Sequence, residues 1–149
     1  MKKMHLKGSW IIKAPREEIY KIMSDFENMP KYFPAVAEQL EITERDGNNL
    51  VIKAEAKTFG RVISVDMKTE LRPPFGYISE NRNNIGISGH EKFLMEEIPE
   101  GTKINYVYDI ELENPIFQIF GRFLIRWYAM RFWEHAVIDK LKEMLEKDN

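Results

Sequence analysis

The sheet of this chain is decided by residues 38–71, which read EQLEITERDGNNLVIKAEAKTFGRVISVDMKTEL. Apolar and polar residues alternate along this stretch, and a period of two is typical of strands with one buried face. Asp46-Gly47 interrupts the alternation and predicts a hairpin, because glycine accepts the positive φ of such turns. At Phe59-Gly60 the alternation changes phase, which indicates a second tight turn or bulge. The stretch therefore predicts three consecutive antiparallel strands.

The same alternation predicts an earlier strand over Met4–Lys13. Three turn signals rich in proline, glycine and asparagine predict three more strands downstream. These strands lie around residues 77–80, 90–98 and 102–112. We therefore expect a seven-stranded antiparallel sheet in which the last six strands follow one another directly.

Helices are expected on both sides of this run of strands. Pro15 is typical of a helix start, and apolar residues recur at helical spacing as far as Phe26. Pro30 and Pro34 bracket either a second, very short helix or a tight loop. Asn114-Pro115 begins a helix that is predicted to run to about residue 147, a length of about 45 Å at about 1.5 Å per residue. The fold class is therefore α+β.

The long helix has two apolar faces of different extent. One stripe persists over its whole length and is expected to face the sheet. It comprises Ile116, Ile119, Phe123, Trp127, Met130, Val137, Leu141 and Met144. The opposite face is apolar only in the first half, where it holds Phe117, Leu124, Ile125, Tyr128 and Phe132. This outer patch needs a cover, for which a loop or a second copy of the chain is favoured over a membrane surface.

Composition excludes several classes of protein. The chain has 149 residues, the usual size of one domain, and its 22 basic and 24 acidic residues leave a net charge of −2, which does not favour nucleic acid as a partner. Cysteine is absent, which excludes disulfides, thiolate metal sites and cysteine nucleophiles. The segment 115–133 contains three arginines and is a poor membrane span. No signal peptide is apparent, so we expect a cytoplasmic protein.

No strong catalytic motif is present. His5, His90 and His135 are far apart and lack metal-ligand spacing. The chain has neither a phosphate-binding glycine loop nor a serine in a nucleophile elbow. We therefore predict no metal site and no cofactor, and we assign no catalytic residue.

Two segments resemble the opening of START-like proteins: IIKAPREEIY at residues 11–20 and DFENMPKYFP at residues 25–34. The turn and strand EGTKINY at residues 100–106 and the long final helix match the layout of the same superfamily, also called SRPBCC. It comprises polyketide cyclase/dehydrase and lipid-transport proteins. The resemblance covers essentially the whole chain in element order. It lies near the aromatase/cyclase-like, quinone-binding and carbon-monoxide-dehydrogenase-subunit-G-like branches.

This resemblance implies a helix-grip fold, in which a curved seven-stranded sheet surrounds the last helix and a hydrophobic cavity. The implied function is binding or transfer of a lipid, an isoprenoid quinone or a polyketide-like aromatic. A cyclase or aromatase that uses the same cavity is the alternative. The superfamily has no universal catalytic residue to carry over.

Inward-facing residues are the candidate lining of that cavity, although a packed core needs the same residue types and is an equal alternative. They are Trp10, Ile52, Ala54, Val65, Met67, Phe93, Met95, Tyr106, Tyr108, Phe123, Trp127 and Met130. Ala54 and Ala56 leave room that larger residues would fill. We expect the ligand to pass the segment Glu27–Ala37 and the neighbouring strand turns.

Polar candidates inside the cavity are Glu91, Arg126 and Glu134, and the enzyme alternative adds Tyr106 and Tyr108 as acid/base groups. Arg126 and Glu134 lie near the inward stripe, so they either reach water along its edge or form a polar spot that orients a ligand. Four residues of the outer patch, Phe117, Leu124, Tyr128 and Phe132, predict a homodimer or a transient contact with a protein or membrane.

Overall fold

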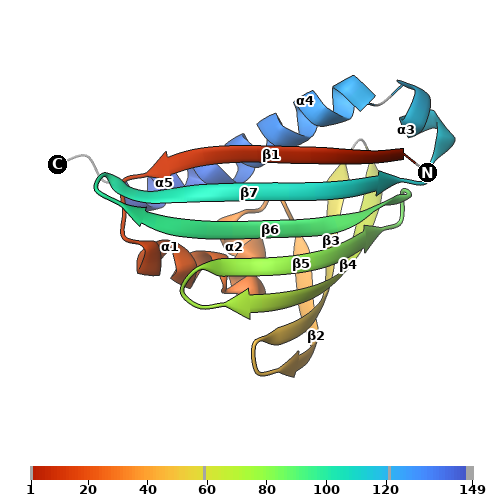
Figure 1. Ribbon diagram of the computed structural model, residues 1–149. Coiled ribbons are helices and arrows are strands. Elements are labelled where there is room, and N and C mark those ends of the chain that lie inside the picture. The colour runs from red at the N-terminus through yellow and green to blue at the C-terminus, as the bar shows by residue number, and fades with distance from the viewer. Residues whose placement is uncertain (1, 59, 121, 147–149) are drawn as a thin grey trace.

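The computed structural model describes residues 2–58, 60–120 and 122–146, and Figure 1 shows one curved sheet with helices on one side. The strands are β1 (Lys2–Ile12), β2 (Gln39–Asp46), β3 (Asn49–Thr58), β4 (Arg61–Arg72), β5 (Gly76–Asn83), β6 (Ile87–Ile98) and β7 (Gly101–Leu112). The helices are α1 (Arg16–Met23), the 3-10 helix η1 (Phe26–Asn28), α2 (Met29–Tyr32), α3 (Pro115–Phe120), α4 (Arg122–Trp133), the π-helix η2 (Glu134–Ile138) and α5 (Asp139–Leu145).

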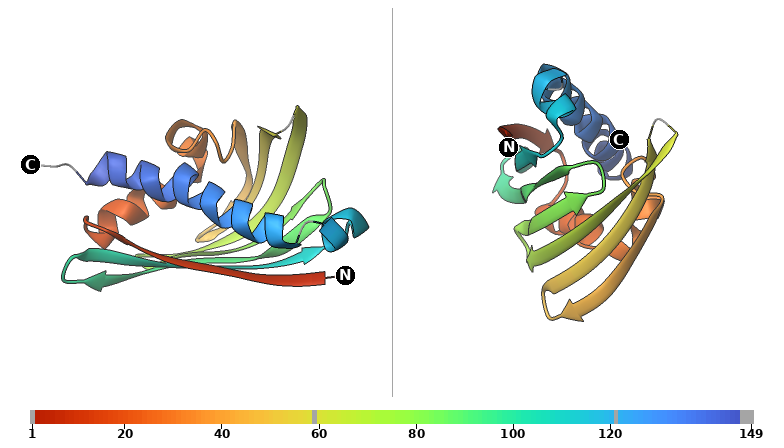
Figure 2. Two further views of the ribbon diagram at one scale, coloured as in Figure 1. Left: turned by 90° about the horizontal axis from the view of Figure 1, so that it is seen from above. Right: turned by 90° about the vertical axis from the view of Figure 1, so that its right-hand side faces the viewer.

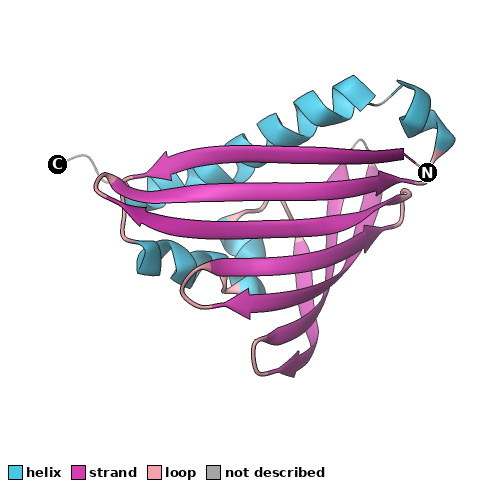
Figure 3. Ribbon diagram, viewed as in Figure 1, coloured by secondary structure: helices cyan, strands magenta, loops and turns pink. Residues whose placement is uncertain are grey.

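The seven strands pair in the order β1-β7-β6-β5-β4-β3-β2, and every pair is antiparallel. This confirms the predicted sheet and the helix-grip arrangement (Figure 3). β5 and β6 are longer than expected, because the ladder continues through the pair Asn81 and Gly89. Asn81 is polar and Gly89 has no side chain, so the apolar alternation cannot be seen in the sequence at this pair.

Two glycines set the geometry of the turns. Gly47 lies between β2 and β3 with a φ of 60°, as Asp46-Gly47 predicts. Gly76 begins β5 with a φ of 141°, and a Cβ at this position would lie 1.8 Å from the carbonyl oxygen of Phe93. Because only glycine fits this close approach, the start of β5 lies tightly against β6 and Tyr77 is held opposite Phe93.

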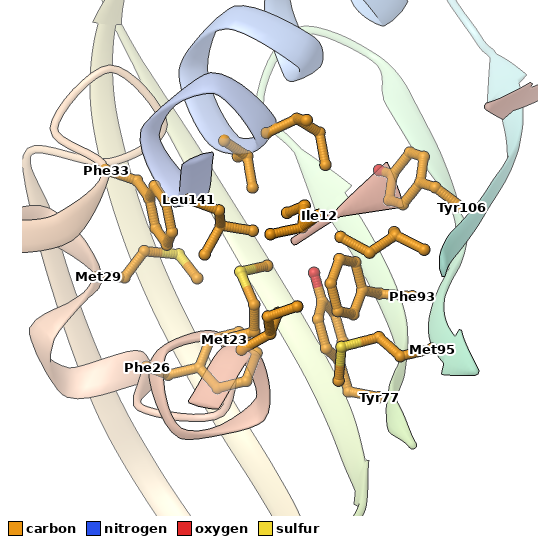
Figure 4. Close-up of a cluster of buried hydrophobic side chains, with 14 of the residues drawn as sticks. Ile12, Met23, Phe26, Met29, Phe33, Tyr77, Phe93, Met95, Tyr106 and Leu141 are labelled. Atoms are coloured by element: carbon orange, nitrogen blue, oxygen red, sulfur yellow. The ribbon is translucent and has the colours of Figure 1, made fainter. Parts of the chain in front are cut away.

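The main core lies between α1, α2, α5 and the neighbouring part of the sheet (Figure 4). Phe26 meets Tyr77 edge-on with ring centroids 5.3 Å apart, and Tyr77 stacks on Phe93 at 5.4 Å. Ile12 of β1 and Leu141 of α5 are fully buried in the same cluster. A smaller second cluster joins β1 and β7 to α4. It comprises Met4, Leu6, Ile110 and Leu112, with Ile125, Ala129 and Met130 packed against them.

The final helix is not the continuous α-helix that the sequence predicts. α3 and α4 are separate helices that point in different directions (Figure 2), and η2 inserts a π-turn between α4 and α5. Because a π-turn adds one residue to a turn, it rotates the preceding helix by about 100° relative to the helix after it.

This rotation explains why the predicted inward stripe is wrong at Trp127, although Met130 of the same stripe packs inward as predicted. Val137 and Leu141, within and after the π-turn, are buried as predicted. Trp127, which precedes the turn, is 60% exposed, and Ile116 on the separate α3 is 64% exposed. Ile125, which we expected on the outer face, packs inward instead. The predictions for Phe117, Ile119, Phe123 and Leu124 fall on side chains outside the described part of the structure.

Candidate functional site

A row of polar side chains crosses the middle of the inner face, which is the face of the sheet toward the helices. The strand register makes Thr69, Ser79, Glu91 and Tyr108 direct neighbours across β4, β5, β6 and β7. The hydroxyl groups of Thr69 and Ser79 are hydrogen-bonded at 3.1 Å. Such a row on an otherwise apolar face marks the place where a ligand's polar group can be recognised.

Glu91 is the acidic member of this row, and it is 9% exposed. The Tyr106 hydroxyl donates a hydrogen bond to Oε2 of Glu91. In the same row, the half-buried Tyr108 donates to Oδ1 of Asn81 on the neighbouring row, at 2.6 Å. The carboxyl group therefore lies among phenol donors instead of water.

A stack of aromatic rings leads from Glu91 to a second carboxylate. The ring of Tyr106 stacks on Trp133 with centroids 4.0 Å apart, and Trp133 stacks on Trp10 at 5.3 Å. Nε1 of Trp10 then donates to Oε1 of Glu134 at 3.0 Å. The π-turn begins at Glu134, so it positions both Trp133 and Glu134 over β1 and β7.

Burial shifts the pKa values of this cluster. Desolvation raises the pKa of Glu91, and the hydrogen bonds from Tyr106 and Tyr77 oppose the shift because they stabilise the carboxylate. Burial, reinforced by the nearby Glu91 charge, raises the pKa of both Tyr77 and Tyr106 well above the ordinary range. The phenols therefore remain protonated donors, and Glu91 is the member of this cluster whose charge can change.

The inner face is less well covered beside α4 than beside α1, α2 and α5. α4 packs against β1 (Figure 2) and reaches β7 through the second cluster. On β3 and β4, Ala56, Val65 and Met67 face inward but remain half-buried. An apolar wall is therefore partly open to solvent on this side of the polar row.

A pocket of about 340 Å³ lies between this part of β3 and α4. Its walls come from the α2–β2 connection, from β3 and from α4. The lining residues are Pro34, Ala35, Glu38, Ala56, Lys57, Tyr128 and Phe132. Ala56 contributes only a methyl group to the wall.

A larger groove of about 1060 Å³ crosses the outer face of the sheet, which is turned away from the helices. Charged side chains of both signs line it, including Lys3, Asp66, Glu80 and Glu111. Lys3 and Glu111 approach one another to 3.8 Å across β1 and β7. The inner face is the better candidate site for an apolar ligand despite its smaller pocket, because the half-buried apolar wall of Val65 and Met67 lies on it.

A sequence model of the family described as "Polyketide cyclase / dehydrase and lipid transport" matches residues 3–146. The chain belongs to this family. No curated protein matches the chain by sequence.

Solved structures show the fold of the polyketide cyclase/dehydrase and lipid-transport family in proteins of low sequence identity. BexL, the di-domain ARO/CYC of the BE-7585A biosynthetic pathway, superposes with a TM-score of 0.83 at 13% identity. The match covers 99% of this chain and 51% of BexL, so the chain spans about half of that protein. The Zhui aromatase/cyclase from a Streptomyces species has a TM-score of 0.76 at 12% identity, covering 97% of this chain and 94% of Zhui. A START superfamily protein from Mycobacterium smegmatis has a TM-score of 0.71 at 18% identity, and the match covers 97% of each chain.

Within this family fold, the predicted lining residues on the strands all face inward. Ile52, Ala54, Phe93, Met95 and Tyr106 are buried. Trp10, Val65, Met67 and Tyr108 are half-buried. The buried group takes part in packing, so the half-buried group is the part of the predicted lining that a ligand can reach. Their role in ligand binding stays a prediction.

The structure places the predicted site residues of the final helix in different surroundings. Met130 is half-buried against the inner face and Glu134 accepts a hydrogen bond from Trp10, whereas Arg126 and Trp127 are exposed. The π-turn is the reason, because it places Trp127 outside the inward stripe. The side chain of Phe123 lies outside the described residues.

Sequence reasoning missed four inner-face residues, namely Thr69, Tyr77, Ser79 and Asn81. Three of them are polar and interrupt the apolar alternation, and Tyr77 belongs to a strand whose alternation is weak. The hairpin at residues 73–76 was the available signal. Once its register is known, Ser79 must lie opposite Thr69.

Proposed function

We propose that the protein binds a hydrophobic small molecule between α4 and the inner face of the sheet. The observation that carries this proposal is the buried Glu91–Tyr106 pair beside an apolar wall that is only partly covered. Met67 on that wall pairs directly with Asn81, which accepts the hydrogen bond of Tyr108. An apolar surface with a few polar groups at one end suits an amphipathic ligand.

The size of the pocket supports a small or partly inserted ligand. Its volume of about 340 Å³ lies at the lower end of ligand pockets, which span roughly 300–1,000 Å³. Burial contributes about 25 cal/mol per Å² of apolar ligand surface before ordering costs, so a ligand that extends from the pocket onto the half-buried wall of Val65 and Met67 would gain the most. The candidate ligands are a lipid, an isoprenoid quinone and a polyketide-like aromatic.

The test combines native extraction with a variant that fills the pocket. Mass spectrometry of an organic extract identifies any bound hydrophobe, and equilibrium dialysis measures affinity for decylubiquinone and oleate. Ala56→Phe places a ring in the space that the ligand would occupy and is expected to weaken binding about tenfold, which corresponds to about 1.4 kcal/mol. Val51→Phe adds the same bulk to the outer face of the same strand and serves as the control.

Retained binding in the Val51 variant together with weakened binding in the Ala56 variant supports the inner site. Repeated absence of an extracted hydrophobe, with no affinity for either probe, contradicts the proposal. Equal loss in the two variants also contradicts it, because the effect would then not depend on the pocket.

Glu91 favours an aromatase/cyclase-type reaction as the second candidate function. A carboxyl group with a raised pKa beside phenol donors has the properties of a general acid. The sequence predicts five groups as acid/base candidates. Glu91, Tyr106 and Tyr108 are neighbours, whereas Glu134 lies at Trp10 and Arg126 is exposed. If the protein converts a polyketide thioester analogue, Glu91→Gln should lower the rate about 100-fold while leaving binding intact.

A further inference from the structure

The exposed apolar side chains of this protein are concentrated on its last helices. The described residues include six large apolar side chains that are exposed, and three of these lie on α3 and α4. Ile116 is 64% exposed, Trp127 60% and Tyr128 48%. Trp127 and Tyr128 are neighbours on α4, and adjacent exposed apolar side chains mark an interaction site more often than isolated ones do.

The charge of the same segment differs from that of the whole chain. Residues 115–133 contain three arginines and no aspartate or glutamate, although the chain carries a net charge of −2. Arg126 and Arg131 are exposed, and the Arg131 guanidinium lies over the Trp127 ring at 5.3 Å from its centroid. Tryptophan, tyrosine and arginine together on one exposed helix are typical of helices that lie in the headgroup region of a bilayer.

We propose that α3 and the exposed side of α4 dock onto an anionic lipid bilayer. In this arrangement Ile116, Trp127 and Tyr128 enter the interface, while Arg126 and Arg131 contact lipid phosphates. A symmetric dimer through this surface is less favourable, because it would bring the same arginines of two copies together with no carboxylate of this segment to pair with them. No helix in the described ranges is long and apolar enough to cross a membrane.

The pocket between β3 and α4 adjoins this docking surface. Tyr128 belongs to both, as an exposed residue of α4 and as a wall of the pocket. Glu38 and Lys57 also line the pocket, and their opposite charges offset one another. A bilayer held by α4 would therefore lie beside the pocket. The docking itself does not depend on a bound ligand.

The test is co-sedimentation of the full chain with vesicles. Vesicles of phosphatidylcholine mixed with phosphatidylglycerol are compared with pure phosphatidylcholine, at low and high salt. The wild-type protein should bind the anionic vesicles, and salt should weaken binding because it screens the arginines. Each arginine near an anionic surface is worth about a fivefold change in affinity, so the double variant Arg126→Gln/Arg131→Gln should bind about 25-fold more weakly.

Trp127→Glu tests the apolar part of the surface and should weaken binding at least about tenfold. Ile11→Glu is the matched control, because Ile11 is 47% exposed on the outer face of β1. Circular dichroism checks that both variants remain folded. The proposal is overturned if anionic vesicles do not sediment the protein, or if Trp127→Glu and Ile11→Glu lose binding equally. It is also overturned if Trp127→Glu converts a dimer into a monomer and vesicles have no effect.

Discussion

Glu91 illustrates how much one residue's environment depends on strand register. It occupies an inner-face position on β6, where the neighbouring strands place Ser79 on one side and Tyr108 on the other. The phenol of Tyr106 and apolar rings surround the Glu91 carboxyl group in place of water. Such a carboxyl group resists losing its proton more than a surface glutamate does.

This pKa shift makes the free energy of unfolding depend on pH. Because folding raises the pKa of Glu91, the folded state holds its proton more tightly than the unfolded state. The stability that this pKa shift contributes is fully present below the unfolded pKa of about 4. It is lost as the pH rises through the folded pKa. Glu91→Gln stays neutral and keeps an acceptor for Tyr106. It should therefore match the wild type near pH 4 and exceed it in melting temperature at pH 7–8.

Thermal unfolding of both proteins between about pH 4 and pH 8 checks this expectation, and the difference between the two curves cancels other titrating groups. A constant difference across that range would show that Glu91 has the same pKa in the folded and unfolded states.

Single residues of the site could be predicted where the alternation is strong. Phe93, Met95 and Tyr106 face inward as predicted, because the apolar periodicity on β6 and β7 is unbroken. The sequence left two settings open for Glu91, a buried carboxyl or a solvated position at an open sheet end. Only the packing of Tyr106 and Trp133 around it decides between them.

Among the elements, the π-turn at residues 134–138 has the largest effect on the candidate site. Helical periodicity predicts which residues share a face only while each turn has about 3.6 residues. The five-residue segment η2 violates this rule and joins two helices whose inward faces are out of phase. Residue types within the segment, EHAVI, are ordinary for an α-helix, so no pattern predicts the insertion.

Deletion of His135 tests this interpretation. His135 is exposed, and its ring nitrogen hydrogen-bonds Asp139 at 2.8 Å. Removing one residue should convert the π-turn into α-helix and turn α4 about 100° away from β1 and β7. The loss of the second cluster should destabilise the protein by about 3 kcal/mol, or about 10 °C in melting temperature.

His135→Ala is the control for this deletion, because it removes the same side chain without changing the length of the helix. It should cost only a few tenths of a kcal/mol, as expected for an exposed pair. Equal melting temperatures for the two variants would mean that α4 does not need the π-turn in order to pack.

At the scale of the whole molecule, the two hydrophobic clusters give the final helices unequal support. Ile138 and Leu141, at the end of η2 and on α5, are fully buried in the main core. No described side chain of α4 is fully buried, and its contacts are made by half-buried residues such as Ile125 and Met130. The sheet and the packed core are therefore expected to stay intact when α4 opens.

Hydrogen exchange followed by mass spectrometry should resolve this difference. Amides of α4 should exchange at least about tenfold faster than those of α5, because local opening of α4 exposes less apolar surface. A bound ligand or anionic vesicle should slow exchange in α4 and leave α5 unchanged. Equal protection of α4 and α5 in the free protein would contradict the unequal support.

The overall architecture could be predicted from the sequence more fully than the site could. Turn glycines and strict alternation specify strand number and direction, and the hairpin at Asp46-Gly47 is found where predicted. The pocket depends instead on how α4 leans over β1 and β7 and away from β3. That lean arises from packing between distant segments, which periodicity along one segment cannot encode.

The placement of the three tryptophans gives the protein two separate optical reporters. Trp10 and Trp133 are stacked beside Tyr106 in the interior, whereas Trp127 is 60% exposed on α4. Fluorescence of the stacked pair responds to changes near Glu91, and emission from Trp127 responds to the surroundings of the helix. Trp127→Phe leaves only the signal of the interior pair. Comparing this variant with the wild type therefore separates changes near the inner face of the sheet from changes at the surface of α4.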